Sequence, residues 1–310
     1  MLPIHQSLRR NTYRLKEPAD KQRKLRVTFA RLTATLILSC VAPLASGAPI
    51  PSTQTTEGVE IDWLKTIVSI EREVVGKSAQ AVGTGFLLTT PRSHLVLVTA
   101  RHVVVDQNKL IRTGLAYRLN RRSGSSLLFS ESAFEHVAGN WFISQSADVA
   151  CRFIATSDEL DLASLSYSSL LPQVQVRPGA PLLVPGFPMG LRSEVYASPI
   201  VRRGIVALSE QSELLVDASL FPGNSGGPVF YVPFFKVAPP LQSASLSENR
   251  VIGLVSENIS YVETAVSEQT GKARITFEQN AGLSVVIPAD AILALLTRAD
   301  VVAADEALGK

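Results

Sequence analysis

Ser225 lies in the segment FPGNSGGPVF, residues 221–230, where glycines and prolines surround a single hydroxyl. A serine becomes a nucleophile at neutral pH only when a nearby base takes its proton, and histidine is the usual base. The residues from Gly223 to Gly227 fit the short G-x-S-x-G pattern of a nucleophile elbow, which on its own is a weak signal. The order of the histidines and carboxylates along the chain therefore decides which chemistry this serine could serve.

The chain has four histidines, and all of them precede the serine: His5, His94, His102 and His136. In α/β-hydrolases the histidine follows the nucleophile, so this order argues against that enzyme class. The subtilisin order needs an aspartate before the histidine. Beyond residue 47 only Asp62 has that position, in a segment typical of a linker or short helix. The order histidine, aspartate, serine has a candidate at every position.

His102 is the strongest candidate for the base. The apolar run HLVLVTA, residues 94–100, predicts a buried strand that ends just before it. A side chain at the end of a rigid strand is held within the small tolerance that catalysis needs. His94 begins the same strand in a polar context and His136 lies in the loop-like segment FEHVAGN, so both are interpreted as surface or loop histidines.

Five aspartates lie between the candidate base and the serine: Asp106, Asp148, Asp158, Asp161 and Asp217. Asp148 leads directly into the apolar run DVACRFIA, where a buried carboxylate needs a hydrogen-bonded partner such as an imidazole N–H. Asp106 is too near His102 in the chain to favour a return onto its ring, and the two aspartates of SDELD are typical of a solvated loop. Asp217 has an apolar setting similar to that of Asp148 and stays open as the rival, with a structural role as its other interpretation.

The first 47 residues differ in composition from the rest of the chain. Nine basic side chains precede the apolar run LTATLILSCVAPLASGA, which predicts an export signal cleaved near Ala48. A lipoprotein signal at Cys40, an uncleaved membrane anchor and a misassigned start are the alternatives. Without residues 1–47, 21 basic side chains stand against 25 acidic ones, so the charge does not support nucleic-acid binding. We expect a periplasmic or secreted protein, which would contact a membrane through its N-terminal segment only if that segment is uncleaved or lipidated.

Beyond residue 48, short apolar runs recur between clusters of Gly, Pro, Ser and Asn. This spacing predicts an all-β protein built as a sandwich or a pair of barrels. The helical periodicity of residues 289–308, after Pro288, predicts a single C-terminal helix. Residues 232–249 and the polar run 258–272 break the strand rhythm and are interpreted as surface loops.

Eight segments together resemble trypsin-like serine proteases of the chymotrypsin fold, in the style of the bacterial HtrA/DegP group. They follow the family's order between about residues 80 and 290: GTGFLL, VTARHVV, ADVA, VPGFPMGL, VRRGIVA, VDASLFPGNSGGPVF, VIGLVSE and AGLSVVIPA. The resemblance implies two six-stranded antiparallel β-barrels with the active site in the cleft between them. It implies a linker at 48–65, a protease domain at 66–290 and a C-terminal helix and tail at 291–310, without a PDZ domain. The first barrel would span about 66–170 and the second about 171–290.

The same resemblance implies a role for each candidate residue. His102 would be the general base, Asp148 would orient its imidazole, and Ser225 would attack the substrate carbonyl. The N–H groups of Gly223 and Ser225 match the oxyanion hole of the family. Asp217 matches an aspartate before the nucleophile loop that is not a triad member.

Two positions depart from the pattern of the digestive proteases. Asn224 stands where those enzymes carry an aspartate that pairs with a freed amino terminus, so we expect no activation of that kind. Arg101 stands beside the histidine where a small residue or asparagine is commoner, and nothing in the sequence explains it.

The resemblance also locates the primary specificity pocket. Ser219 aligns with its base, where cleavage after Arg or Lys would require an acid, so we expect a small or medium apolar substrate side chain. Val255, Ser256 and Ser284 align with its wall.

The remaining features limit the chemistry. Cys151 in its apolar run is typical of a small buried side chain rather than a nucleophile, and no Cys/His cluster has metal-ligand spacing. We therefore expect neither a metal nor a cofactor. The expected activity is that of an exported serine endopeptidase that acts on protein or peptide substrates. A catalytically inactive barrel pair that serves as a binding module and an esterase-type serine hydrolase are the alternatives.

Overall fold

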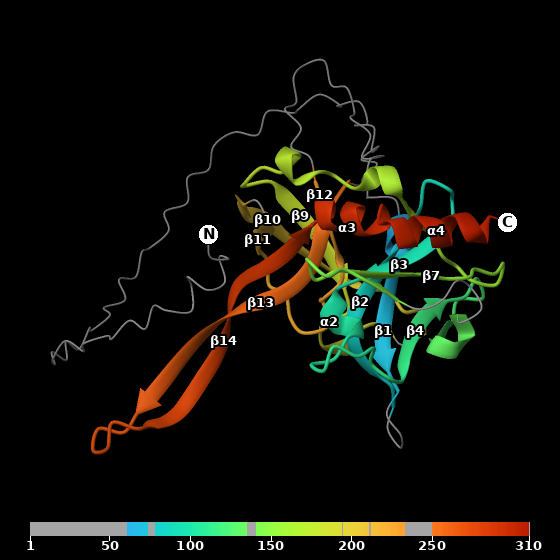
Figure 1. Ribbon diagram of the computed structural model, residues 1–310. Helices are drawn as coiled ribbons and strands as arrows, with labels where there is room; N and C mark the ends of the chain where they lie inside the picture. The colour runs from blue at the N-terminus through green and yellow to red at the C-terminus, as the bar shows by residue number, and fades with distance from the viewer. Residues whose placement is uncertain are drawn as a thin grey trace, which may run out of the picture. The chain divides into compact units, whose positions relative to one another are not determined.

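The computed structural model describes residues 61–73, 78–134, 141–193, 195–210, 212–232 and 250–309. Strands predominate in these ranges, and the helices are short except at the C-terminal end (Figure 1). The predicted all-β class is confirmed. The predicted export signal, most of the linker and almost all of the predicted loop 232–249 lie outside the described residues.

The first sheet is built from strands that occur between residues 67 and 166. These are β1 (Ile67–Arg72), β2 (Gln80–Thr89), β3 (Leu95–Thr99), β4 (Leu115–Asn120), β5 (Ser126–Ser130), β6 (Phe142–Ile143), β7 (Ala150–Phe153) and β8 (Leu165–Ser166). The antiparallel path runs β5-β4-β1-β2-β3-β7-β6, and β8 joins β2 in parallel. This sheet has eight strands rather than six because the two-residue strands β6 and β8 pair with β7 and β2.

The second sheet is a closed six-stranded barrel, as predicted. Its strands are β9 (Pro181–Gly186), β10 (Ile200–Glu210), β11 (Glu213–Asp217), β12 (Pro228–Tyr231), β13 (Arg250–Val266) and β14 (Ala273–Pro288). The order around the barrel is β10-β11-β14-β13-β12-β9. Alternate strand residues such as Leu182, Val184, Val229 and Val286 point inward and are fully buried, as the two-residue period of a strand requires.

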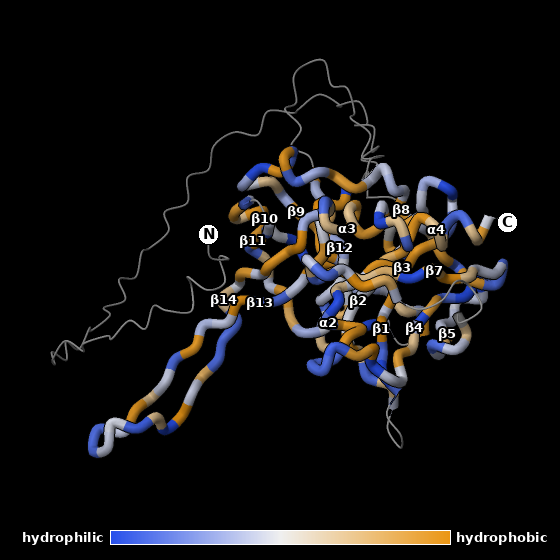
Figure 2. The backbone as a smooth tube through the Cα atoms, in the orientation of Figure 1, coloured by the Kyte–Doolittle hydropathy of each residue, from blue (hydrophilic) through white to orange (hydrophobic). Residues whose placement is uncertain are grey.

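One buried cluster joins the first sheet to part of the second barrel. It includes Phe86 and Leu97 of the first sheet together with Phe187, Phe230 and Leu254 from the second half of the chain. In Figure 2 the hydrophobic parts of the tube are concentrated in the packed strands. The contact between the two β units is therefore a continuous apolar core.

Strands β13 and β14 continue beyond the barrel as a two-stranded ribbon (Figure 1). Their pairing runs from Ser260 opposite Asn280 to Val266 opposite Ala273. The predicted loop 258–272 is therefore wrong for residues 258–266, and only 267–272 form the connection. The β-branched and aromatic residues of 258–266 pair with β14, the strand that follows. The ribbon leaves large apolar side chains exposed: Tyr261, Val262, Val266, Ile275 and Phe277.

The predicted C-terminal helix is two helices, α3 (Ala289–Leu296) and α4 (Ala299–Leu308). The break falls at Thr297 and Arg298, because the backbone of Arg298 is extended and its guanidinium donates to the carbonyl of Ile143 at 2.7 Å. A second contact anchors α4, where the buried Asp305 accepts a hydrogen bond from Thr90 at 3.0 Å. The last segment of the chain is thereby attached to the first sheet.

The other helical segments have six residues or fewer: η1 (Ile61–Thr66), α2 (Arg101–Val104), η2 (Glu131–Phe134), η3 (Tyr167–Ser169), η4 (Gln173–Gln175) and η5 (Pro188–Gly190). Two of them, α2 and η5, lie at the ends of strands β3 and β9. No helix in the described ranges is both long enough and apolar enough to cross a membrane.

Candidate active site

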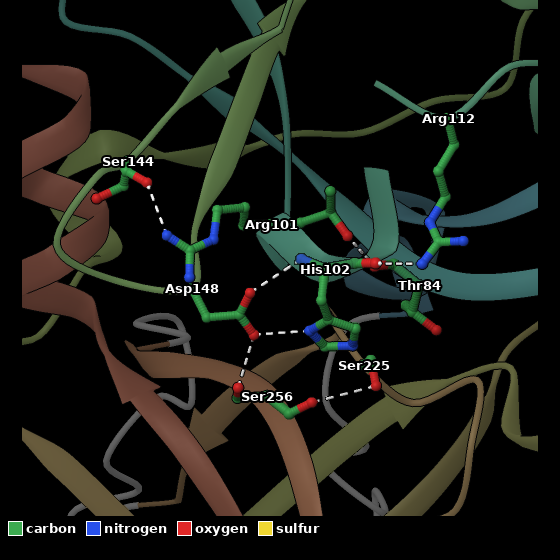
Figure 3. Close-up of polar contacts among 9 residues, drawn as sticks. Thr84, Arg101, His102, Arg112, Ser144, Asp148, Ser225 and Ser256 are labelled. Carbon is green, nitrogen blue, oxygen red and sulfur yellow. Dashed lines mark hydrogen bonds and ion pairs between the residues drawn. The ribbon is translucent and has the colours of Figure 1, made fainter. Parts of the chain in front are cut away.

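His102 and Asp148 come together because their strands are neighbours in the first sheet. β3 pairs antiparallel with β7, with Thr99 opposite Ala150, and the two side chains lie just beyond that pair. Nδ1 of His102 lies 2.7 Å from Oδ2 of Asp148, and the backbone N–H of His102 donates to Oδ1 at 2.9 Å (Figure 3). Both carboxylate oxygens are therefore committed to the same residue, which fixes the imidazole relative to the carboxylate.

Ser256 of β13 connects this pair to the nucleophile. Its Oγ donates to Oδ2 of Asp148 at 2.6 Å, and its carbonyl accepts a hydrogen bond from Oγ of Ser225 at 3.2 Å (Figure 3). The sequence predicts Ser256 in the wall of the specificity pocket, and the contact of its hydroxyl with Asp148 was not predicted. A continuous hydrogen-bonded path thus runs from His102 through Asp148 and Ser256 to Ser225.

Ser225 stands on a tight turn between β11 and β12. The N–H of Asn224 donates to the carbonyl of Phe221 at 3.0 Å, and the N–H of Gly227 donates to the carbonyl of Asn224 at 2.9 Å. The fully buried Asn224 side chain closes the same turn, because its Oδ1 accepts from the N–H of Phe221 at 3.1 Å. Asn224 therefore stabilises the loop locally.

The backbone at Gly223 and Ser225, the predicted oxyanion hole, has two distinctive features. Gly223 has φ +100°, and a Cβ there would lie 2.3 Å from the carbonyl oxygen of Phe187. Only glycine is compatible with both constraints. Within the part of the chain that the structure describes, the N–H groups of Gly223 and Ser225 have no hydrogen-bond acceptor. Two unsatisfied donors beside a serine hydroxyl are suited to binding a developing oxyanion.

Arg101 has a structural explanation. Its guanidinium donates to the carbonyl of Ser144 at 3.2 Å (Figure 3). The Oγ of Ser144 in turn accepts from the N–H of Ala147 at 3.2 Å. Arg101 therefore ties the turn that carries the histidine to the loop that carries Asp148. A second arginine, Arg112, donates to the carbonyl of His102 at 3.2 Å.

The environment of Asp148 favours its charged form. Burial opposes ionisation, but the hydrogen bond and charge of His102 and the hydroxyl of Ser256 outweigh it and lower the pKa of Asp148 to about 2. An aspartate in an unfolded chain has a pKa of about 3.9. The folded state therefore binds this proton less readily than the unfolded state.

This shift predicts a pH-dependent contribution to stability. Because the folded pKa is the lower one, the stabilisation is complete above about pH 4 and is lost as the pH falls through about 2. We expect the difference in unfolding free energy between the wild type and Asp148→Asn to shrink by about 2 kcal/mol from pH 6 to pH 2 in urea titrations. A pH-independent Asp148→Asn difference would contradict the assignment.

The predicted pocket residues have different surroundings. Ser219 is exposed, whereas Val255 is buried in the second barrel. Ser284 is fully buried, and its Oγ donates to Oδ1 of Asn258 at 3.1 Å. Asn258, two residues after Ser256 in the chain, is therefore the hydrogen-bond partner of Ser284, and it was not predicted from the sequence.

The other candidates are placed away from this hydrogen-bonded path. Nδ1 of His94 lies 2.7 Å from Oδ1 of Asp305 of α4, Asp217 is exposed at the end of β11, and His136 lies outside the described residues. Cys151 is fully buried, and burial raises the pKa of its thiol to about 12, so it is a poor nucleophile. Searching the described ranges gives no group of three or more His, Cys, Asp or Glu side chains that could hold a metal ion.

Residues 83–232 match the family of trypsin-like peptidase domains. No curated protein matches the sequence. Similar solved structures include the HtrA-type protease AlgW with a tripeptide, at 16% identity and a TM-score of 0.42, over 75% of this chain and 59% of that one.

Two further structures have comparable scores. AlgW with a decapeptide has 15% identity and a TM-score of 0.42, over 75% of this chain and 62% of that one. The Rv3671c protease in its inactive form has 15% identity and a TM-score of 0.41, over 76% of this chain and 88% of that one. The aligned part thus spans about three fifths of the AlgW chains. The match to trypsin-like peptidase domains, over residues 83–232, covers just under half of this chain.

Proposed function

We propose that this protein is a serine endopeptidase that cleaves peptide bonds with His102, Asp148 and Ser225. The observation that carries the proposal is the pair of contacts from His102 to Asp148, at 2.7 and 2.9 Å, on the same hydrogen-bonded path as the Ser225 hydroxyl. The family match over residues 83–232 supports a peptidase, and the unsatisfied N–H groups beside Ser225 support acyl transfer.

In the proposed mechanism, the Ser225 hydroxyl turns from the carbonyl of Ser256 to the free nitrogen of His102, which takes its proton as the oxygen attacks the substrate carbonyl. Asp148 holds the imidazole by Nδ1 and stabilises the imidazolium. The imidazolium then gives the proton to the leaving amine, and a water molecule repeats the sequence on the acyl-enzyme. The free acid is released and the serine is restored.

The backbone supplies the remaining stabilisation. The N–H groups of Gly223 and Ser225 would bind the negative oxygen of the tetrahedral intermediate. Removal of one such donor typically costs about 3 kcal/mol of transition-state stabilisation. The substrates would be proteins or peptides. The leader-like residues 1–47 support action outside the cytoplasm, in the periplasm or as a secreted enzyme.

The test is covalent labelling of folded protein with a fluorophosphonate probe at pH 8. We expect the probe at Ser225, and we expect Asp148→Asn to slow labelling by about 10⁴-fold because the imidazole loses its orientation and its counter-charge. Asp217→Asn, at the exposed rival position, should label at the wild-type rate. If folded wild-type protein is not labelled, the chain is instead a catalytically inactive barrel pair, and if only Asp217→Asn is impaired, the triad assignment is wrong.

A further inference from the structure

Thr84 of β2 makes four hydrogen bonds at the junction of the two β units. Its N–H donates to the carbonyl of Ser225 at 2.8 Å, and its own carbonyl accepts from the hydroxyl of Thr99 at 2.7 Å. Its hydroxyl donates to the carbonyl of Gly223 at 2.6 Å and accepts from the N–H of Phe187 at 3.1 Å. Thr84 is fully buried, so water cannot replace these contacts.

The turn η5 holds the carbonyl of Pro222, the residue before Gly223 in the nucleophile loop. The N–H of Met189 donates to the carbonyl of Pro222 at 2.6 Å. Met189 has φ +53°, in the left-handed region that non-glycine residues rarely adopt, and its side chain is 62% exposed. The turn therefore presents a backbone donor to the loop, and its side chain contributes little to the core.

Together these contacts fix both peptide groups that flank Gly223. In a trans peptide the N–H points away from the preceding C=O. With the carbonyl of Pro222 held by Met189, the N–H of Gly223 must point to the opposite side, where no described residue accepts it. With the carbonyl of Gly223 held by Thr84, the peptide that follows cannot turn either.

We propose that the hydroxyl of Thr84 and the N–H of Met189 are positioning groups that aim the Gly223 N–H into the oxyanion hole. The inference rests on the proposed peptidase activity and adds two groups to it that touch neither the substrate nor the reacting atoms. Gly83, next to Thr84, allows β2 to approach the nucleophile loop, because a Cβ at Gly83 would lie 2.6 Å from Val103 and 3.1 Å from the carbonyl of Ser225.

The test compares three variants in steady-state hydrolysis of a peptide identified with the wild type. Thr84→Val keeps the shape but loses the hydroxyl, and we expect kcat to fall by about 100-fold with KM unchanged, because the oxyanion interaction is made only in the transition state. Thr84→Ser keeps the hydroxyl and should restore most of kcat. Thr99→Val is the matched control, because it removes a neighbouring buried hydroxyl that does not contact Gly223 and should lower Tm while largely preserving kcat.

Three results would overturn the proposal. The first is a Thr84→Val variant with kcat within about threefold of the wild type. The second is a Thr84→Ser variant as impaired as Thr84→Val, which would mean that the methyl group matters rather than the hydroxyl. The third is an equal loss of kcat in Thr99→Val. Thr84→Ala replaces Thr84→Val if the valine variant does not fold.

A structural readout separates this inference from the proposed function. In a crystal structure of Thr84→Val we expect the peptide between Gly223 and Asn224, whose carbonyl the Thr84 hydroxyl holds, to turn and to change the direction of the Gly223 N–H. If the wild type hydrolyses no peptide, the proposed function fails, but the orientation of this peptide still decides the inference. An unchanged orientation in both Thr84→Val and Thr84→Ala refutes it.

Discussion

Replacement of Ser225 by alanine is expected to abolish peptide hydrolysis, with kcat lowered by about a million-fold. The reason is that Ser225 supplies the proposed nucleophile, whereas the Ser256 hydroxyl on the same path is bonded to the Asp148 carboxylate. The fold should survive, because the Ser225 side chain makes a single hydrogen bond to a backbone carbonyl. The measurement is steady-state cleavage of an unfolded protein substrate, with unfolding curves recorded in parallel.

The matched control is Ser123→Ala, at an exposed serine whose hydroxyl is hydrogen-bonded to that of Ser125 in a surface turn. It should cleave the substrate at the wild-type rate. Residual cleavage by Ser225→Ala within about 100-fold of the wild type, after removal of contaminating proteases, would mean that another group is the nucleophile.

Replacement of Gly226 by alanine is expected to cause the largest loss of stability of any conservative change near the site. Gly226 has φ +83°, and a Cβ there would lie 2.1 Å from Oγ1 of Thr99 and 2.2 Å from the carbonyl oxygen of Thr84. Left-handed strain and overpacking each cost about 1–3 kcal/mol, so we expect the unfolding free energy to fall by about 3–5 kcal/mol. Urea unfolding measures this loss.

Gly124→Ala separates the two contributions. Gly124 has φ +86°, but a Cβ there would have no atom within 4 Å, so only the backbone strain is added. We expect a loss of about 1–2 kcal/mol there. Equal losses at Gly124 and Gly226 would show that close packing behind the nucleophile contributes nothing.

The site residues that could be predicted from the sequence are those whose residue type is unusual in its local sequence context. Glycine at 223 and 226 indicates unusual backbone angles, and an aspartate at the start of an apolar run indicates a buried partner. His102 follows an apolar strand, and the order of the residues then excluded competing folds. Such signals are local, so no knowledge of the tertiary structure is needed to find them.

The contacts that were not predicted join residues far apart in the chain. Ser256 bonds to Asp148 across 108 residues, and Thr84 bonds to Gly223 across 139. Serine and threonine are common, so their types give no signal before the two sheets are placed against each other. Arg101 differs, because its type is uncommon beside the histidine, but its partner is a carbonyl in a loop whose position the sequence does not determine.

The strand extension also shows the limit of pattern reading. Residues 258–266 contain the strand formers Ile, Tyr, Val and Thr, but the Asn, Ser and Glu among them interrupt the apolar pattern on which the loop prediction depended. Their strand conformation comes from pairing with β14, where Val262 faces Glu278 and Thr264 faces Thr276. Pairing with β14, rather than the burial of an apolar face, therefore accompanies the strand conformation here.

Each β unit provides a hydrogen bond to a candidate site residue or loop of the other unit. Thr84 of the first sheet binds the loop of Ser225, while Ser256 of the second barrel binds the Asp148 carboxylate of the first. Neither half therefore contains a complete site, and a small separation of the halves would break both contacts together. Peptide hydrolysis should therefore depend on the contact between the halves. In mild denaturant we expect hydrolysis to be lost while the secondary structure of each half persists.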